Sequence, residues 1–273
     1  MQDELIIKPG KSIKHYWKEL WQYRELFLFL SWRDILVRYK QTVIGLAWSI
    51  LRPFLTMIVF TVVFGKIAKL PSNGIPYPIL VYSALLPWQF FASVFQDGSN
   101  SLLNNSGMIS KIYFPRLIIP STSLIVGFVD FLISLTIFVG LIVWYRYIPP
   151  VTVFLLPIFL LLTVIPSLGA SLWISSLNVR YRDFKYIVPF VVQFGLYISP
   201  VGFNSSIVPD KWKLLYSLNP MVAPIDGFRW CLLGHSAPLN MTAFLLSAGV
   251  SLIILLTGIQ YFRSTERKFA DLI

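Results

Sequence analysis

Long apolar stretches separated by short polar segments dominate the sequence and predict membrane-spanning helices. The first stretch runs from Ala47 to Gly65, and Arg52 and Pro53 interrupt its apolar and small residues. A helix of this length can cross a hydrocarbon core about 30 Å thick. The predicted spans are residues 47–65, 77–95, 117–145, 151–177, 186–203 and 243–262. We therefore expect an all-α membrane protein with six transmembrane helices.

A different pattern precedes the first span, in residues 11–46. Apolar and aromatic side chains recur at intervals of three and four from Ile13 to Leu30, with charged and polar residues between them. This spacing predicts a helix with one apolar face, which favours a position in the interfacial plane of a membrane. Two interpretations stay open: a membrane-surface anchor, and a docking surface for a soluble partner.

The segment 204–242, between the last two spans, also contains helix signals. Asn219 and Pro220 are typical of a helix start, and Gly234 is typical of a helix end. The apolar run between them measures about 21 Å at 1.5 Å per residue, which is too short to cross a membrane. We expect short re-entrant helices at the outer side, with a second one at 209–218. They would form either a lid over a pathway or simple interfacial packing.

Composition agrees with a single membrane domain over residues 1–273. Hydrophobic residues make up 56% of the chain and charged residues only 13%, with a mean hydropathy of +0.70. These values exclude an ordinary soluble globular domain. The net charge of +11 comes from basic residues in short loops, which indicates membrane topology and anionic lipid rather than nucleic acid. The single cysteine, Cys231, excludes an intrachain disulfide.

The distribution of lysine and arginine predicts the orientation. If the N-terminus is cytoplasmic, the cytoplasmic segments contain 16 of these residues and the outer loops contain six. Positive charge is retained on the cytoplasmic side of membrane proteins. We therefore expect the chain to lie in the inner membrane. Both termini, including the tail at 263–273, are expected on the cytoplasmic side.

Two features bear on the source of energy. The triplet at residues 10–12, Gly-Lys-Ser, lacks the earlier glycine of a phosphate-binding loop, because Leu5 stands at that position. The chain is therefore not expected to hydrolyse ATP or to bind a cofactor.

Asp130 is the one carboxylate predicted at mid-membrane. It would serve either proton coupling or, as we favour, a polar contact between helices involving Ser134 or another helix.

Four motifs resemble one family of transport proteins. They are RDILVRYKQTVIGLAWSILRPFLTMIVFTVVFG at 33–65, VRYRDFKYIVPFVVQ at 179–193, ISPVGF at 198–203 and LNPMVAPIDGFRW at 218–230. Together they resemble the type 2 permeases of ABC transporters that export polysaccharides such as O-antigen, capsule and teichoic acid. The resemblance implies a homodimer with two copies of a cytoplasmic ATPase that binds ATP and magnesium. The substrate would be a polyprenyl-linked polysaccharide, with O-antigen as the expected polymer.

The resemblance also assigns residues at the two ends of the pathway. The N-terminal helix and the loop at 104–110 would dock the ATPase, and the short outer helices would gate the exit. The docking candidates are Trp17, Trp21, Asn104, Asn105 and Ser106, and the gate candidates are Asn219, Pro220, Met221 and Arg229.

Two further sets are candidates for substrate contact. Aromatic rings stack on sugars without reading their order, although interfacial belts explain many such residues equally well. Cytoplasmic arginines can bind a pyrophosphate, although the positive-inside bias alone would put them there. The aromatic candidates are Tyr82, Trp88, Phe90, Phe91 and Phe95, and the arginine candidates are Arg33, Arg38, Arg180 and Arg182.

Alternatives from other classes remain. A membrane glycosyltransferase or polymerase would also be rich in aromatic residues, but the outer segments lack the expected pair of carboxylates. A secondary transporter would show internal repeats, and we find none that is convincing. An ABC permease for teichoic acid, capsule or a small lipophilic substrate would share this fold.

Overall fold

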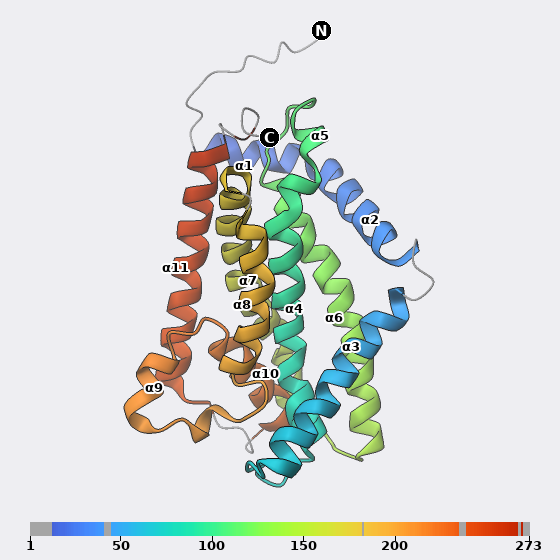
Figure 1. The fold of residues 1–273 in the computed structure, drawn as a ribbon, viewed down its shortest axis with the longest axis vertical. Coiled ribbons are helices and arrows are strands. Elements are labelled where there is room, and N and C mark those ends of the chain that lie inside the picture. The colour runs from blue at the N-terminus through green and yellow to red at the C-terminus, as the bar shows by residue number, and fades with distance from the viewer. Residues whose placement is uncertain (1–12, 41–44, 182, 235–238, 267–268, 270–273) are drawn as a thin grey trace.

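Helices form every regular element in the described part of the chain (Figure 1). The computed structural model describes residues 13–40, 45–181, 183–234, 239–266 and 269. Five of its helical segments are long and apolar enough to cross a membrane. They are α3 (Gly45–Phe60) with its π-helical extension η1 (Thr61–Ile67), α4 (Tyr77–Asn104), α6 (Ile118–Trp144), η2 (Val151–Leu155) with α7 (Leu156–Arg180), and α11 (Met241–Thr265). Five of the six predicted spans are thereby confirmed as helices of spanning length.

The remaining predicted span, at 186–203, corresponds to the shorter helix α8 (Phe184–Ile198). Its 15 residues give a length of about 22 Å. The helix ends early because Ser199 precedes Pro200, and a residue before proline is biased toward extended backbone. Ser199 has φ −77° and ψ 155°. The prediction of a full-length helix to residue 203 was therefore wrong by about one turn.

The N-terminal region folds as two helices rather than one, α1 (Ile13–Gln22) and α2 (Arg24–Lys40). Helix α1 lies across one end of the bundle, which we call the α1 end, and α2 slopes from it along the side of the bundle (Figure 1). Side chains on one face of these helices, including Tyr23 and Phe27, pack with the buried Leu30 against the ends of α4, α6, α7 and α11. This apolar face therefore packs on the bundle, and the predicted position in the membrane interface stays a prediction.

The opposite end, the α10 end, carries the segment between α8 and α11. It contains η3 (Ser205–Ile207), α9 (Asp210–Tyr216) and α10 (Val222–Leu233). Both predicted short helices are present, and Gly234, with φ +64°, ends α10 as expected. Eleven of the twelve residues of α10 are buried, so this helix packs inside the bundle and does not lie on its surface.

Helix α4 forms the centre of the bundle. In its most apolar stretch 78% of the residues are buried, against 17 to 28% in the other four long segments. The outer helices thus bury fewer of their side chains inside the folded chain, and each has exposed apolar side chains, as expected for contact with lipid or another protein. Close packing of α7 and α11 depends on two glycines, because a Cβ atom at Gly258 would lie 2.5 Å from the carbonyl oxygen of Gly169.

Candidate functional site

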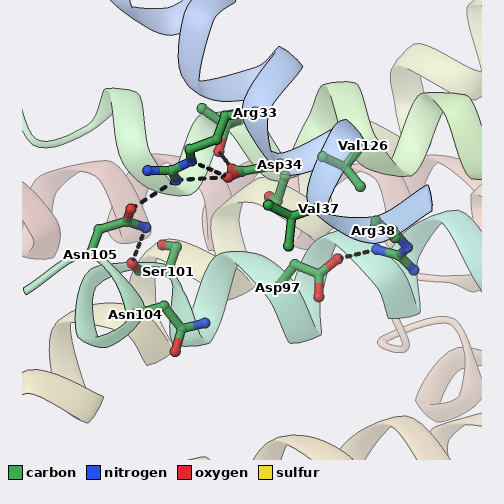
Figure 2. Close-up of a pocket in the computed structure, with 11 residues that line it drawn as sticks. Arg33, Asp34, Val37, Arg38, Asp97, Ser101, Asn104, Asn105 and Val126 are labelled. Carbon is green, nitrogen blue, oxygen red and sulfur yellow. Dashed lines mark hydrogen bonds and ion pairs between the residues drawn. The ribbon is translucent and has the colours of Figure 1, made fainter. Parts of the chain in front are cut away.

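A polar cavity of about 570 Å³ opens between α2, α4 and α6 near the α1 end (Figure 2). Nine of its eleven lining residues have a charged, amide or hydroxyl side chain. The lining residues are Arg33, Asp34, Val37, Arg38, Asp97, Ser101, Asn104, Asn105, Thr122, Ser123 and Val126. Two predicted arginines and two predicted docking residues therefore meet in one site.

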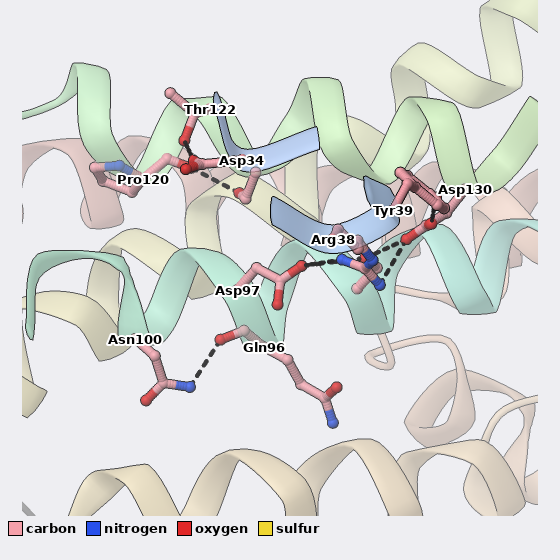
Figure 3. Close-up of polar contacts among 11 residues, drawn as sticks. Asp34, Arg38, Tyr39, Gln96, Asp97, Asn100, Pro120, Thr122 and Asp130 are labelled. Carbon is pink, nitrogen blue, oxygen red and sulfur yellow. Dashed lines mark hydrogen bonds and ion pairs between the residues drawn. The ribbon is translucent and has the colours of Figure 1, made fainter. Parts of the chain in front are cut away.

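Arg38 of α2 joins the two long helices α4 and α6 (Figure 3). Its Nη1 lies 2.7 Å from Oδ2 of Asp97, and its Nη2 lies 2.8 Å from Oδ2 of Asp130. Burial lowers the pKa of Arg38, but the carboxylates of Asp97 and Asp130 more than offset this, so that its pKa lies above the usual value. Arg38 therefore stays charged and links three helices.

Asp130 receives two further hydrogen bonds. Tyr39, the neighbour of Arg38 on α2, donates its hydroxyl to Oδ1, and Ser93 of α4 donates to Oδ2 over 2.9 Å. The Asp130 side chain is only 15% exposed. Its contacts are those of the polar link between helices that we favoured from sequence, although the partners are on α2 and α4 rather than Ser134.

Arg33 belongs to a second polar cluster, five residues before Arg38 on the same helix (Figure 2). Its guanidinium donates to Oδ1 of Asp34 at 2.7 Å and to Oδ1 of Asn105 at 2.8 Å. Thr122 of α6 donates to the other carboxylate oxygen of Asp34 over 3.1 Å. Both cavity arginines are thus paired with carboxylates, and an anionic ligand would have to compete with these pairs.

The other two arginine candidates are not part of this cavity. Arg180 lies at the end of α7, and its guanidinium carbon is 5.1 Å from the ring centre of Tyr181. Arg182 lies outside the described residues. The carboxylates that pair with Arg38, those of Asp97 and Asp130, were not predicted, since a partner 59 or more residues away leaves no local pattern.

A smaller pocket of about 180 Å³ lies beside the first, between α3, α4, α6 and α8. Arg38 lines both, and Asp130 also borders the smaller one. Its wall further includes Arg52, Gln89 and Trp88. Polar groups therefore continue from the larger cavity to a position between the apolar helices α3, α4, α6 and α8.

The five aromatic candidates lie on α4, and all are buried in the folded chain. Their exposed fractions range from 1% to 6%. Tyr82 stacks on Phe138 of α6, and Phe91 stacks on Phe95. Trp88 lines the smaller pocket. A substrate-path role for Phe90 and the others stays a prediction, and it would need the helices to separate.

The ATPase-docking candidates all lie at the α1 end. Trp17 and Trp21 are 48% and 71% exposed. Asn104 and Asn105 line the larger cavity, and Ser106 begins α5 (Ser106–Ile109). Their docking role stays a prediction.

Glu266 fixes α1 to the rest of this end. Its Oε2 accepts a hydrogen bond from the Tyr16 hydroxyl at 2.9 Å, and its Oε1 accepts one from the backbone N–H of Arg116 at 2.8 Å. Burial raises the pKa of Glu266, while its hydrogen bonds act in the opposite direction. Helix α1, the segment before α6 and the end of α11 therefore meet at one carboxylate.

Arg229, a gate candidate, is 1% exposed at the α10 end. Its Nη1 donates to the carbonyl of Phe203 at 2.5 Å and its Nη2 to that of Val201 at 2.9 Å. Its Nε donates to the carbonyl of Leu80 at 3.4 Å. Burial lowers the pKa of Arg229 to about 10, and Asp226 acts against this change. Arg229 thus ties α10 to α4 and to the segment after α8.

The other gate candidates lie beside α11 and the end of α8. The side-chain amide of Asn219 donates to Oγ of Ser199 at 3.0 Å, and Oγ of Ser251 donates to the carbonyl of Pro220 at 3.0 Å. Met221 is 1% exposed. A gating role for this segment stays a prediction.

Comparisons with known proteins give a consistent result. The sequence model that describes ABC-2 type transporters matches residues 25–233. An O-antigen export system permease protein, RfbA, from Myxococcus xanthus is 27% identical over 257 residues, covering 93% of this chain and 97% of that protein. An RfbA from Klebsiella pneumoniae is 26% identical over 250 residues, covering 91% and 95%. The polysialic acid transport protein KpsM from Escherichia coli is 23% identical over 248 residues, covering 88% and 92%.

Proposed function

Since the chain belongs to the ABC-2 type transporter family, we propose that it is the membrane-spanning subunit of an ATP-driven exporter of lipid-linked O-antigen. The relatives named as O-antigen export permeases match 91 to 93% of this chain, and this observation carries the proposal. The family match at 25–233 also includes every residue that lines the larger cavity. Similarity to KpsM, at lower identity, supports export of another polysaccharide, such as a polysialic acid, as the second candidate.

The proposed topology has six spans, with α8 as the fifth. Helix α7 ends at the α1 end, and α8 follows it. The hydroxyl of Tyr147, in the segment before α7, donates to the carbonyl of Leu233 at the end of α10, so α10 lies at the opposite end. The chain between α7 and α10 must therefore cross from one end to the other. An even number of crossings, together with the lysine and arginine distribution, supports cytoplasmic termini in the inner membrane.

The proposed assembly is a pair of these chains around one conduit, with two ATPase subunits at the α1 end. Exposed apolar side chains on α3 and α8, such as Val59 and Phe194, supply a face that a second copy would cover. The exposed tryptophans of α1 supply a docking face at the same end as the cavity. ATP and magnesium would be bound by the ATPase, which would move α1 and the loop at 104–110 and open the conduit.

Purification tests the partner directly. The tagged chain is purified from its own host in mild detergent, without overproduction of other proteins, and assayed for a co-purifying subunit and ATP hydrolysis. We expect an ATPase at about equal stoichiometry. The variant Trp21→Ala is expected to reduce that subunit, while Trp144→Ala, at the exposed far end of α6, serves as its control. A chain that purifies alone in membranes that still transfer sugar would restore the glycosyltransferase alternative.

Export itself is tested by replacing the native gene. Cells that lack the chain are expected to retain lipid-linked polysaccharide on the cytoplasmic side, and re-expression should return it to the surface. Accumulation of another polysaccharide, such as a polysialic acid, instead of O-antigen would favour the second candidate. A truncation up to Leu30 should assemble or export poorly, because it removes α1 and nearly half of α2. Normal export by this truncation would contradict the proposed coupling.

A further inference from the structure

Arg52 is a cation inside the first predicted span. It lies five residues after Ala47, about 7 Å further along the axis of α3. Its side chain lines the smaller pocket together with Arg38, Thr56, Gln89, Gln96 and Asp130. A charge at such a position is costly in an apolar environment unless it reaches the interface or meets an opposite charge.

Arg38 and Arg52 are the two cations that line this pocket, and Asp130 is its acidic lining residue. Arg38 is paired with Asp130 and also with Asp97. The Asp130 carboxylate is already bonded to α2 and to Ser93. No ion pair joins Arg52 to an acidic group among the residues that the structure describes. Arg52 therefore differs from Arg33 and Arg38, which both have carboxylate partners.

Two carboxamides of α4 add neutral hydrogen-bond donors to the same pocket. Gln89 accepts a weak hydrogen bond from Ser134 through its oxygen, at 3.4 Å. The side chain of Gln96 points away from the Arg38–Asp97 pair (Figure 3). Within the described residues, no partner engages the amide nitrogen of Gln89 or Gln96. Each carboxamide can donate two N–H groups to an oxygen-rich ligand.

We propose that this pocket is a phosphate-binding subsite for a lipid, with Arg52 as the charged donor and Gln89 and Gln96 as neutral donors. The phosphate belongs either to a polyprenyl pyrophosphate or to the headgroup of a membrane phospholipid. Charge-assisted hydrogen bonds from a guanidinium are the strong contacts that such a group requires. The polyprenyl ligand in this inference rests on the proposed export function. Arg52, rather than the paired Arg33 and Arg38, is then the arginine that binds the phosphate.

Ligand titration of the purified full-length chain tests the subsite. Farnesyl pyrophosphate and short-chain phosphatidylglycerol are titrated separately by calorimetry, in a nonionic detergent. The variants are Arg52→Gln, which removes the charge, and Arg52→Lys, which keeps the charge but loses the forked donor geometry. Lys185→Gln is the matched control, because Lys185 is an exposed cation beside the Tyr186 ring and outside the pocket. Size-exclusion chromatography confirms folding of each protein.

We expect Arg52→Gln to weaken binding of farnesyl pyrophosphate about tenfold or more, with a smaller loss in Arg52→Lys and none in Lys185→Gln. Loss confined to farnesyl pyrophosphate assigns the subsite to the polyprenyl headgroup. An equal loss for phosphatidylglycerol assigns it to membrane phospholipid. Binding of both probes to Arg52→Gln within twofold of the original chain, or no binding to the original chain, overturns the proposal.

A second variant and a second assay keep the outcome decisive. If Arg52→Gln does not fold, Gln96→Leu on the opposing helix α4 is titrated instead. It should weaken pyrophosphate binding several-fold, and unchanged binding counts against the subsite. Co-purification of the ATPase is measured in parallel. If the variants bind the ligand unchanged and the ATPase still co-purifies, only the subsite is rejected. If no ATPase co-purifies with the original chain, the proposed exporter function is rejected.

Discussion

Arg38 and Arg229 are two buried or half-buried arginines at opposite ends of the bundle, and they are held in different ways. Arg38 is bound by the side-chain carboxylates of Asp97 and Asp130, and its side chain is 37% exposed beside a cavity. Arg229 is 1% exposed and is bound by three backbone carbonyls. The first arrangement can exchange partners with a ligand or with water, whereas the second cannot without unfolding.

This difference has a consequence for any transport movement. The ion pairs of Arg38 are partly exposed, so separating α2 from α4 and α6 should cost less than breaking the buried contacts of Arg229. Loss of a buried guanidinium leaves several acceptors without donors, which is expensive. We therefore expect α2 to be the part that moves, and the α10 end to move as one unit if it opens at all.

The largest expected effect tests the fixed end. Arg229→Met keeps much of the side-chain length but removes all donors to the carbonyls of Leu80, Val201 and Phe203. It also leaves the buried Asp226 without a nearby cation. We expect a loss of about 3–5 kcal/mol in unfolding free energy, measured by chemical unfolding in detergent. Lys213→Met, on the exposed helix α9, is the control. A loss below about 1 kcal/mol in unfolding free energy would show that the hydrogen bonds of Arg229 do not stabilise the α10 end.

A smaller effect is expected at the exchangeable end. Arg38→Met removes both ion pairs and leaves the carboxylates of Asp97 and Asp130 unpaired. We expect about 1–3 kcal/mol of destabilisation in the same unfolding assay, together with faster proteolysis of α2. Arg38→Lys should retain most of the stability because it keeps the charge. If Arg38→Met were as damaging as Arg229→Met, the two ends would not differ as described.

Asp226 predicts a pH dependence at the fixed end. Burial raises its pKa to about 6, while Ser205 and Arg229 act in the opposite direction. Because its pKa in the unfolded chain is about 3.9, the folded state binds more protons between pH 4 and 6. Stability from this group is therefore present at the acid side and decreases as the pH rises toward 6.

The expected size of that decrease is roughly 1–3 kcal/mol, since a tenfold change in proton affinity corresponds to about 1.4 kcal/mol. The measurement is unfolding free energy at pH 4.5, 5.5 and 6.5. Asp226→Asn should flatten the profile between these values, whereas Asp183→Asn, on an exposed residue before α8, should leave it unchanged. A profile that keeps its slope in Asp226→Asn would assign the pH dependence to another group.

Sequence patterns predicted where the helices lie in the chain better than they predicted which residues of different helices contact each other. Apolar length and turn residues identified five helices of spanning length, both short outer helices and the end of α10 at Gly234. These features depend on residues close together in the chain. The break between α1 and α2 was missed, because the spacing of apolar residues continues through Tyr23 without interruption.

The candidate sites show why the rest could not be predicted. Arg38 meets Asp97 and Asp130 only because three helices pack together, and no local spacing encodes that. Arg229 binds backbone carbonyls, which every residue possesses, so its partners have no sequence signature. The aromatic candidates occur on several sides of α4, so sequence periodicity could not distinguish rings that are buried from rings facing a conduit.

The smallest expected effect concerns Asp130, one of the two carboxylates that hold Arg38. Asp130→Asn removes one of the two carboxylates that bind Arg38, while Asp97 and the hydrogen bonds to the remaining oxygen stay available. We expect less than about 1 kcal/mol of destabilisation, because the pair is partly exposed through Arg38. Export of polysaccharide to the cell surface should continue nearly unchanged, since the energy would come from ATP. Asp97→Asn, which removes the more exposed carboxylate, is the matched control and should behave alike. Complete loss of export in Asp130→Asn alone, with normal folding and ATPase assembly, would instead support proton coupling at Asp130. It would also show that the exchangeable end has a chemical role beyond holding α2.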